Sequence, residues 1–515
     1  MGISRRSFVR GLGAAGLAAA SPTLWFRPDA LASEPPEQLH LQFGKDASRQ
    51  VVASWATPGS VRRPRLRLGN KHGGFGETVH AETRTYVDGK SGVEVFTHHA
   101  HLNRLHPETE YTYEVMHDGA VPVGGSFTTA PRGRKPIRFT SFGDQSTPVP
   151  GDGLWSPFAG FNPPQVELAR PLFHLLNGDL CYANISQNPR QDTWRHFFMN
   201  NQVSARNRPW MPAAGNHENE LNNGPFGFLA YQTRFALPDN GQKEPALRGM
   251  WYSFTAGSVR VISLNNDDVC YQDGGDSYVR GYSDGAQKLW LERELTAANQ
   301  DDDIDWIVVC MHQVAMSSVH NFNGADLGIR QEWLPLFDRH GVDLIVCGHE
   351  HHYERTKAVR GVDPASATTL RPMVVSDRLD VIDTSQGLVQ MILGGGGTSA
   401  PSDGLFYDPP RGDVIMSVGP QAPTPPGSPR PKRVPNKVTE EAPWVGVRDR
   451  LHAYGFAAFD VDPGDEDGMT SIDVTFYDTA PSADGVPAVF ERFKLVRPRR
   501  AGEREREREA VTQAV

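Results

Sequence analysis

Apolar and polar residues alternate along the first quarter of the chain with the two-residue period that is typical of half-buried β-strands. The segments LHLQF (39–43) and YTYEV (111–115) each place every second, apolar residue on one face, and the apolar run VVASW (51–55) lies between them. The pattern therefore predicts an all-β domain over residues 38–131.

The pattern changes from residue 136 onward, where short apolar strands alternate with helical or loop segments. This alternation is typical of an α/β layer structure, which we expect over residues 136–498. The segment SDGAQKLWLEREL (283–295) predicts an amphipathic helix. Apolar alternation returns at FAAFDV (456–461) and SIDVTFYD (471–478), which we expect to be the last strands of the same domain.

Two segments depart from both patterns. Residues 399–445 are rich in proline and glycine, as in PTPPGSPRPKR (423–433), and predict a long surface excursion. Residues 499–515 form a charged tail in which EREREREA (503–510) has no apolar face, so we expect disorder there.

The N-terminus carries a targeting pattern. SRRSFVR (4–10) precedes the small, apolar run GLGAAGLAAA (11–20) and then ALA (30–32), which resembles a twin-arginine signal peptide over residues 1–32. The apolar run is too short to span a bilayer comfortably, and no later segment approaches about 20 uninterrupted apolar residues. We therefore expect an exported protein, secreted or held in the cell envelope or periplasm, without an integral membrane span.

Composition and charge narrow the possible partners. The 515 residues are enough for two or three domains, and the formal net charge is −9. Removal of residues 1–32 takes away four arginines and one aspartate, so the mature protein is more acidic still. Because phosphate backbones bind to basic surfaces, this charge argues against nucleic acid as a partner. The spacing of the four cysteines suggests neither a disulfide framework nor a zinc site.

Closely spaced histidines occur twice in the chain, in THHAH (97–101) and in GHEHHYER (348–355). On a β-strand His99 and His101 share one face, so a metal site is geometrically possible. No carboxylate, cysteine or further histidine lies nearby in a ligand-like pattern. We therefore interpret THHAH as a solvated strand face.

Five apolar strands in the second domain are each followed by a turn that carries aspartate, asparagine or histidine. They read IRFTSFGD, FHLLNGDLCY, PWMPAAGNHE, DWIVVCMH and VDLIVCGHEHHYER. Open α/β sheets bind ligands beyond the carboxyl ends of their strands, so these turns can converge on one crevice. A glycine before four of these turns lets the backbone bend sharply and approach an ion. The candidate ligands are Asp144, Asp179, Tyr182, Asn216, His312, His349 and His351.

This ordered series of GD, GDxxY, GNHE, H and GHxH resembles the purple acid phosphatases within the calcineurin-like metallophosphoesterase superfamily. LHPETEY (105–111) resembles the tyrosine-corner stretch of fibronectin type III domains, and larger family members carry such an N-terminal domain. The resemblance covers residues 38–498. It implies a multidomain protein with an N-terminal all-β, fibronectin III-like sandwich and an α/β metallophosphoesterase domain, a β-sandwich flanked by helices. Ser146 stands where the family usually has the second glycine of GDxG, so we expect a changed loop with Asp144 kept.

The resemblance also implies a dinuclear centre and a role for each ligand. Asp179 would bridge two ions, and the phenolate of Tyr182 suits Fe(III). The second ion would be divalent zinc, iron or manganese. The Fe(III) site would be completed by Asp144, Tyr182 and His351, and the divalent site by Asn216, His312 and His349.

Two further histidines are candidate catalytic residues by the same resemblance. His217, beside Asn216, would contact the phosphate. His320, in SSVHNF, would bind phosphate or protonate the leaving alkoxide, with an ordinary loop histidine as the alternative. His352 falls outside GHxH, and we interpret it as a packing residue or an outer neighbour of the centre.

The function implied is that of an exported acid phosphatase, a metal-dependent phosphoric monoester hydrolase. A metal-bound hydroxide would attack a small phosphoester substrate, drawn by a residual charge of about +1 on the centre. Two alternatives stay open: a phosphodiesterase on the same metal core, and a catalytically inert binding module of the cell envelope.

Overall fold

The computed structural model describes residues 34–70, 73–272, 275–320, 322–398, 403–421, 433–451, 454–464, 468–480 and 486–500. The predicted signal peptide lies outside these residues. So do most of the charged tail and the middle of the predicted excursion.

The N-terminal domain is a β-sandwich of two four-stranded sheets, as the alternating pattern predicted. One sheet has the order β1-β2-β6-β5 and the other the order β4-β3-β7-β8. Alternate residues of the strands, such as Leu39, Leu41 and Tyr113, are buried between them. The strands are β1 (Glu37–Phe43), β2 (Val51–Thr57), β3 (Arg65–Asn70), β4 (Gly73–His80), β5 (Glu82–Val87), β6 (Glu94–Leu102), β7 (Glu110–Met116) and β8 (Val123–Thr128).

The tyrosine of LHPETEY makes the contact expected of a tyrosine corner. The backbone N–H of His106 donates to the hydroxyl of Tyr111 over 2.9 Å, and Tyr111 is buried beside Phe127. The hydroxyl thereby ties the loop to the start of β7. The finer likeness to fibronectin type III domains stays a prediction.

The second domain is α/β, as predicted, and contains two seven-stranded mixed sheets. The first has the order β11-β10-β9-β25-β26-β27-β20. Its strands are β9 (Ile137–Phe142), β10 (Phe173–Asn177), β11 (Trp210–Ala213), β20 (Val381–Asp383), β25 (Gly455–Asp462), β26 (Met469–Asp478) and β27 (Ala488–Pro498). β25 and β26 are the two late strands that the sequence predicted.

The second sheet has the order β12-β13-β14-β16-β21-β17-β24. Its strands are β12 (Tyr252–Ala256), β13 (Val259–Ser263), β14 (Trp306–Cys310), β16 (Leu344–Cys347), β17 (Tyr353–Thr356), β21 (Val389–Leu393) and β24 (Val445–Arg448). Buried residues of both sheets, among them Phe139, Leu175 and Val308, share one apolar cluster. Strands β9, β10 and β11 at one end of the first sheet are parallel, as are β13, β14, β16 and β21 in the middle of the second. Within each group the carboxyl ends lie at the same edge.

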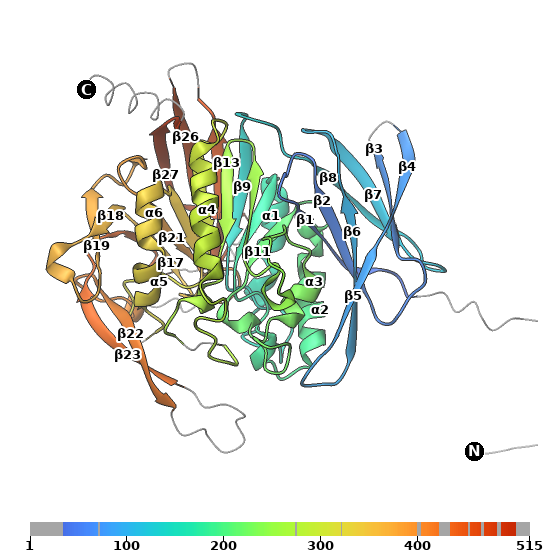
Figure 1. Cartoon of the computed structure of the whole chain (residues 1–515), viewed down its shortest axis with the longest axis horizontal. Coiled ribbons are helices and arrows are strands. Elements are labelled where there is room, and N and C mark those ends of the chain that lie inside the picture. The colour runs from blue at the N-terminus through green and yellow to red at the C-terminus, as the bar shows by residue number, and fades with distance from the viewer. Residues whose placement is uncertain are drawn as a thin grey trace, which may run out of the picture.

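In the part of the chain that the structure describes, six α-helices pack around the two sheets (Figure 1). The helix predicted at 283–295 is observed. It begins three residues later than predicted, after Gly285, and extends to Gln300. No helix in the described ranges is both long and apolar enough to cross a lipid bilayer. The helices are α1 (Asn162–Ala169), α2 (Arg190–Ala205), α3 (Leu229–Arg234), α4 (Ala286–Gln300), α5 (Leu327–Glu332) and α6 (Leu334–His340).

Strands lie within the region predicted as a surface excursion. β22 (Arg411–Gln421) and β23 (Arg433–Glu441) form an antiparallel hairpin that projects from the domain (Figure 1). β22 also pairs with β15 (Ala325–Asp326), and a second hairpin joins β18 (Ala358–Val362) to β19 (Pro372–Ser376). The proline-rich composition of residues 423–432, which separate the two strands in the sequence, concealed the strand pattern.

The interpretation of THHAH as a solvated strand face is wrong for two of its three histidines. His98 and His99 on β6 are buried, and only His101 is exposed. His99 Nε2 lies 2.9 Å from the carbonyl oxygen of Thr233 in the α/β domain, and Nδ1 lies 2.8 Å from Ser54 Oγ. The second domain therefore covers His99, which a pattern within the strand cannot reveal. His98, on the opposite face of β6, is buried within the sandwich beside Trp55 and Thr57.

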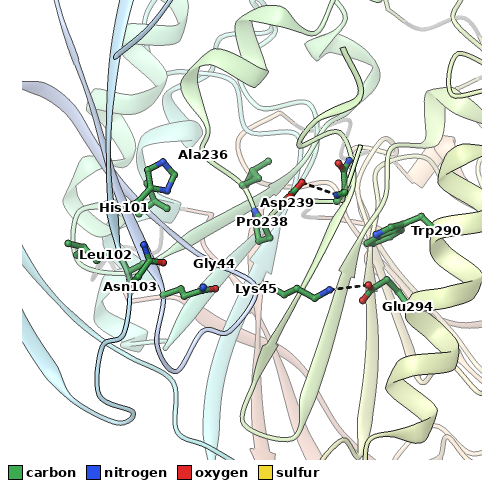
Figure 2. Close-up of a pocket in the computed structure, with 16 residues that line it drawn as sticks. Gly44, Lys45, His101, Leu102, Asn103, Ala236, Pro238, Asp239, Trp290 and Glu294 are labelled. Carbon is green, nitrogen blue, oxygen red and sulfur yellow. Dashed lines mark hydrogen bonds and ion pairs between the residues drawn. The ribbon is translucent and has the colours of Figure 1, made fainter. Parts of the chain in front are cut away.

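A cleft of about 570 Å³ remains open at this domain interface (Figure 2). Lys45 and His101 of the sandwich line it opposite Asp239 and Trp290 of the α/β domain. The ammonium of Lys45 reaches across to Glu294 on α4, 3.3 Å away. Because Lys45 is largely exposed, we expect this pair to contribute little to the interface.

The tyrosine-corner contact gives a stability prediction. Replacing Tyr111→Phe removes the acceptor of the His106 N–H, so the free energy of unfolding should fall by about 1 kcal/mol. Denaturant unfolding of the two proteins measures the difference. An unchanged midpoint would contradict the assigned role of the hydroxyl.

Candidate metal centre

The five predicted turns lie together at the carboxyl ends of the parallel strands. Three follow β9, β10 and β11 of one sheet, and two follow β14 and β16 of the other. Distances of 2.9–3.3 Å link all seven candidate ligands into one network, and six of them are at most 2% exposed. The structure thus brings together Asp144, Asp179, Tyr182, Asn216, His312, His349 and His351.

One cluster within the network contains Asp144, Tyr182 and His351. The Tyr182 hydroxyl lies 3.2 Å from Asp144 Oδ1 and 3.1 Å from His351 Nε2. His351 Nε2 lies 3.3 Å from the same carboxylate oxygen. A carboxylate, a phenol and an imidazole therefore present three donor atoms to one point.

The second cluster is centred on His312. Its Nε2 lies 3.1 Å from Asp179 Oδ2, 3.0 Å from Asn216 Oδ1 and 3.2 Å from His349 Nδ1. Ligand atoms of Asp179, His312 and His349 all lie within 4.8 Å of one another. This mixture of carboxylate, amide and imidazole donors is one that a divalent cation accepts.

Four of the candidate ligands have left-handed backbone conformations. The φ angles are 57° at Asp144, 51° at Asp179, 57° at Tyr182 and 70° at His349. Such conformations cost a non-glycine residue roughly 1–3 kcal/mol and gather at functional sites. Ser146, at the variant glycine position, also has a φ of 63°, so the turn keeps a backbone that glycine would favour.

The motif glycines act mainly by leaving space, which corrects the expectation that each one bends the chain. Only Gly178 among them has a positive φ, 80°. A Cβ atom on Gly215 would lie 2.3 Å from Asp179 Oδ1, and one on Gly348 would lie 2.2 Å from Asp144 Oδ2. Any larger residue would displace these carboxylates.

Hydrogen bonds behind the histidines fix which nitrogen faces the centre. His312 Nδ1 lies 2.7 Å from the carbonyl oxygen of Asn177, so Nδ1 carries the proton and the Nε2 lone pair points into the cluster. His349 Nε2 lies 2.7 Å from Gln272 Oε1, so Nε2 carries the proton. The lone pair of His349 Nδ1 therefore points into the cluster. Two lone pairs 3.2 Å apart repel each other unless a cation or a proton lies between them.

A closed ring of hydrogen bonds holds the His349 side chain. The Gln272 amide donates to Asn323 Oδ1 over 3.0 Å, and the Asn323 amide donates to the His349 carbonyl oxygen over 2.6 Å. Gln272 and Asn323 lie in loops outside the five motifs. The sequence interpretation missed them, because nothing in their local pattern sets them apart.

The buried acidic groups of the centre would be stabilised by added positive charge. Burial disfavours the imidazolium form of His312, but the Asp179 and Asp144 carboxylates and the Asn177 carbonyl together outweigh burial and raise the pKa of His312 to about 10. Burial, with the nearby Asp144 and Asp179 carboxylates, raises the pKa of Tyr182 well above its usual value. A phenolate at Tyr182 therefore needs a cation beside it.

Glu218, the last residue of GNHE, supports the turns. Its carboxylate accepts hydrogen bonds from the backbone N–H groups of Asp179, Leu180 and Gly215 over 2.7–2.9 Å. Burial, reinforced by Asp179, raises the pKa of Glu218 to about 8. One side chain thus joins two of the ligand-bearing turns.

Of the two histidines predicted to be catalytic, one lies beside the candidate metal ligands and the other packs against a tyrosine. His217 lies at the centre, with Nε2 4.0 Å from Asp179 Oδ2 and its ring 4.7 Å from that of Tyr182. His320 instead packs against Tyr407, with ring centroids 4.8 Å apart. The catalytic role of His320 stays a prediction.

The third histidine of GHEHHYER faces away from both clusters. His352 is buried, and its Nε2 lies 3.3 Å from Glu354 Oε2. This placement agrees with its interpretation as a packing residue.

The donor set fits a pair of metal ions. Each cluster offers a carboxylate and at least one imidazole nitrogen, and the backbone N–H of His349 donates to Asp144 over 2.9 Å, which holds the clusters side by side. Buried carboxylates and lone pairs facing each other are unfavourable without a counter-charge.

Comparison with known proteins gives two family matches. Residues 36–129 match the purple acid phosphatase N-terminal domain, and residues 159–353 match the calcineurin-like phosphoesterase family. Two uncharacterized proteins from strains of Mycobacterium tuberculosis are 52% identical over 522 residues, 97% of this chain and 97% of theirs.

Relatives whose names state an activity are less similar in sequence. The Fe(3+)-Zn(2+) purple acid phosphatase 12 of Arabidopsis thaliana is 26% identical over 386 residues, 72% of this chain and 74% of the plant protein. The solved purple acid phosphatase PPD1 from yellow lupin (Lupinus luteus) seeds shares the fold, with a TM-score of 0.65 and 19% identity. That match covers 91% of this chain and 75% of the lupin chain.

The ring behind His349 gives a prediction about metal affinity. Gln272→Met removes the acceptor that fixes the His349 tautomer, so affinity for one of two bound metals should fall by about 10–100-fold. Metal content per chain after dialysis against graded chelator measures the loss.

The matched control is Gln386→Met, at an exposed glutamine whose side-chain amide donates to the neighbouring Ser385 hydroxyl. This variant should retain both metals. Equal metal retention in the two variants would contradict the role assigned to Gln272.

Proposed function

This chain belongs to the purple acid phosphatase family of calcineurin-like phosphoesterases, and on that basis we propose that it is a two-metal acid phosphatase hydrolysing phosphate monoesters. The observation that carries the proposal is the single buried network of seven donor side chains at the strand ends. A catalytically inert binding module would not need four ligand residues with strained backbone at the strand ends.

The proposed metals are Fe(III) and a divalent ion, which would be zinc, iron or manganese. Asp144, Tyr182 and His351 would hold Fe(III), because a phenolate oxygen is a hard donor. Asn216, His312 and His349 would hold the divalent ion, with Asp179 shared between the two. When bound, the ions would supply positive charge for the phosphate and lower the pKa of water.

The remaining residues would orient the substrate. His217 lies where its Nε2, when the imidazolium form carries a proton on both ring nitrogens, could donate to a phosphate oxygen beside Asp179. Its Nδ1 is held by Asn184 Oδ1, 2.9 Å away, so the ring has a fixed orientation. We retain His320 as a candidate donor to the leaving alkoxide, a role that requires it to approach the substrate when bound.

We also propose that the protein is exported by the twin-arginine pathway. The support is the Arg5-Arg6 pattern and the apolar segment that follows it. This route carries folded proteins, so the metals could be inserted before export. The N-terminal sandwich would be of the fibronectin III-like type, on the support of the Tyr111 corner.

A substrate panel tests the reaction class. With both metals bound, the protein should hydrolyse p-nitrophenyl phosphate with a higher kcat/KM than bis(p-nitrophenyl) phosphate. A strong preference for the diester would replace the proposal by the phosphodiesterase alternative. No turnover of either ester by protein containing two metals would refute both.

Absorption spectroscopy tests the assignment of Tyr182. A phenolate bound to Fe(III) gives a visible charge-transfer band, so Tyr182→Phe should abolish the band while Tyr271→Phe keeps it. Tyr271 is a fair control because its hydroxyl donates to Gln331, away from both clusters. An unchanged spectrum in Tyr182→Phe would contradict the ligand assignment.

A further inference from the structure

A buried chain of polar contacts runs from His217 into the N-terminal domain. His217 Nδ1 lies 2.9 Å from Asn184 Oδ1, and the Asn184 amide donates to Asp276 Oδ1 over 3.0 Å. Arg190, the first residue of α2, donates to Asp276 Oδ2 over 3.0 Å. Another Arg190 nitrogen lies 3.6 Å from Oδ1 of Asp88, which belongs to the sandwich.

The charged members of this chain are shielded from water. The side chains of Arg190, Asp276 and Asp88 are 5%, 7% and 0% exposed. One guanidinium thus stands between two carboxylates, one from each domain. Buried ion pairs are weak evidence for stability. Hydrogen bonds nevertheless hold both ends in place, because Arg190 donates to Asp276 and to the carbonyl oxygen of Leu221, and Asp88 accepts from Asn223.

The turn that carries Asp88 reaches the α/β domain at the end where the ligand-bearing loops lie. It joins β5 to β6 over residues 88–93. Gly89 N donates to Asn223 Oδ1 over 2.8 Å, and Lys90 Nζ donates to the carbonyl oxygen of Ser186 over 3.1 Å. A Cβ atom on Gly89 would lie 2.5 Å from the Asn222 side chain, so the turn is closely fitted there.

The two carboxylate oxygens of Asp88 contact different parts of the protein. Oδ2 accepts the backbone N–H groups of Lys90 and Ser91 and so closes its own turn. Oδ1 faces the α/β domain, where it accepts from Asn223 over 3.1 Å and pairs with Arg190. The inward contact can therefore be altered while the turn is kept.

The chain determines the protonation pattern of His217. Arg190 can only donate and the Asp276 carboxylate can only accept, so the Asn184 amide nitrogen must face Asp276. The Asn184 oxygen then faces His217, whose Nδ1 must carry a proton. Nε2 is left to face Asp179 and the substrate position.

We propose that the β5–β6 turn of the N-terminal domain positions His217 through Arg190, Asp276 and Asn184, so that the sandwich is a working part of the phosphoester site. This inference rests on the proposed function for the importance of His217, but its geometry does not. The members of the chain are positioning residues, because they act on His217 through the Asn184 amide.

The test uses the metal-loaded, full-length protein with Asp88→Asn. An asparagine at 88 can keep its oxygen toward the Lys90 and Ser91 N–H groups, but it then turns an amide nitrogen toward Arg190. We expect kcat/KM for p-nitrophenyl phosphate to fall about tenfold, with two metals still bound. The same substitution in a His217→Ala background should change kcat/KM by less than about twofold.

The matched control is Glu37→Gln, which removes an ion pair between the same domain and the same helix. Glu37 on β1 pairs with Arg195 on α2, 2.7 Å away, and Arg195 is half exposed. This variant should stay within about twofold of the wild type, as exposed pairs contribute little. An equal loss in Asp88→Asn and Glu37→Gln would mean that general loosening of the interface is responsible, and would overturn the proposal.

A second measurement separates this inference from the proposed function. In protein labelled with ¹⁵N-histidine, the His217 ring, assigned by its loss in His217→Ala, should show a proton fixed on Nδ1 in the wild type. Asp88→Asn should weaken that preference. If the wild type hydrolyses no phosphoester, the proposed function fails and this signal alone decides the inference. An identical His217 signal in both proteins, or an Asp88→Asn effect that persists without His217, would refute it.

Discussion

The α/β domain must hold two buried carboxylates close together at the ends of adjacent parallel strands, and much of its local structure depends on this constraint. Asp144 and Asp179 each lie within 3.3 Å of an imidazole nitrogen, in a place where water cannot screen their charge. Such a group of acceptors is unfavourable without a cation. The strained backbone, the space left by Gly215 and Gly348, and the Glu218 carboxylate all serve to hold that group together.

The surrounding layers explain how the constraint is met. Parallel strands in both seven-stranded sheets bring distant parts of the chain to one edge, and the turns are then tied to each other by side chains. Gln272 and Asn177 direct the imidazoles from behind. The contacts reach beyond the α/β domain, because Arg190 connects the surroundings of His217 to Asp88 in the sandwich.

The sequence predicted the two-domain architecture and the convergence of the turns because both depend on local patterns. Alternation showed the sandwich, and a polar residue after each buried strand showed the site. Features set by tertiary contact could not be predicted in this way. His99 was wrongly interpreted as solvated because its cover comes from another domain, and Gln272 was missed because it lies in an unpatterned loop.

The central claim is that the seven side chains hold two metal ions. Anomalous diffraction from crystals of the metal-loaded protein, recorded at the iron and zinc absorption edges, tests it most directly. We expect two peaks about 3.5–4 Å apart, one beside Tyr182 and one beside His312, with Asp179 between them. A single peak, or peaks away from these residues, would contradict the account.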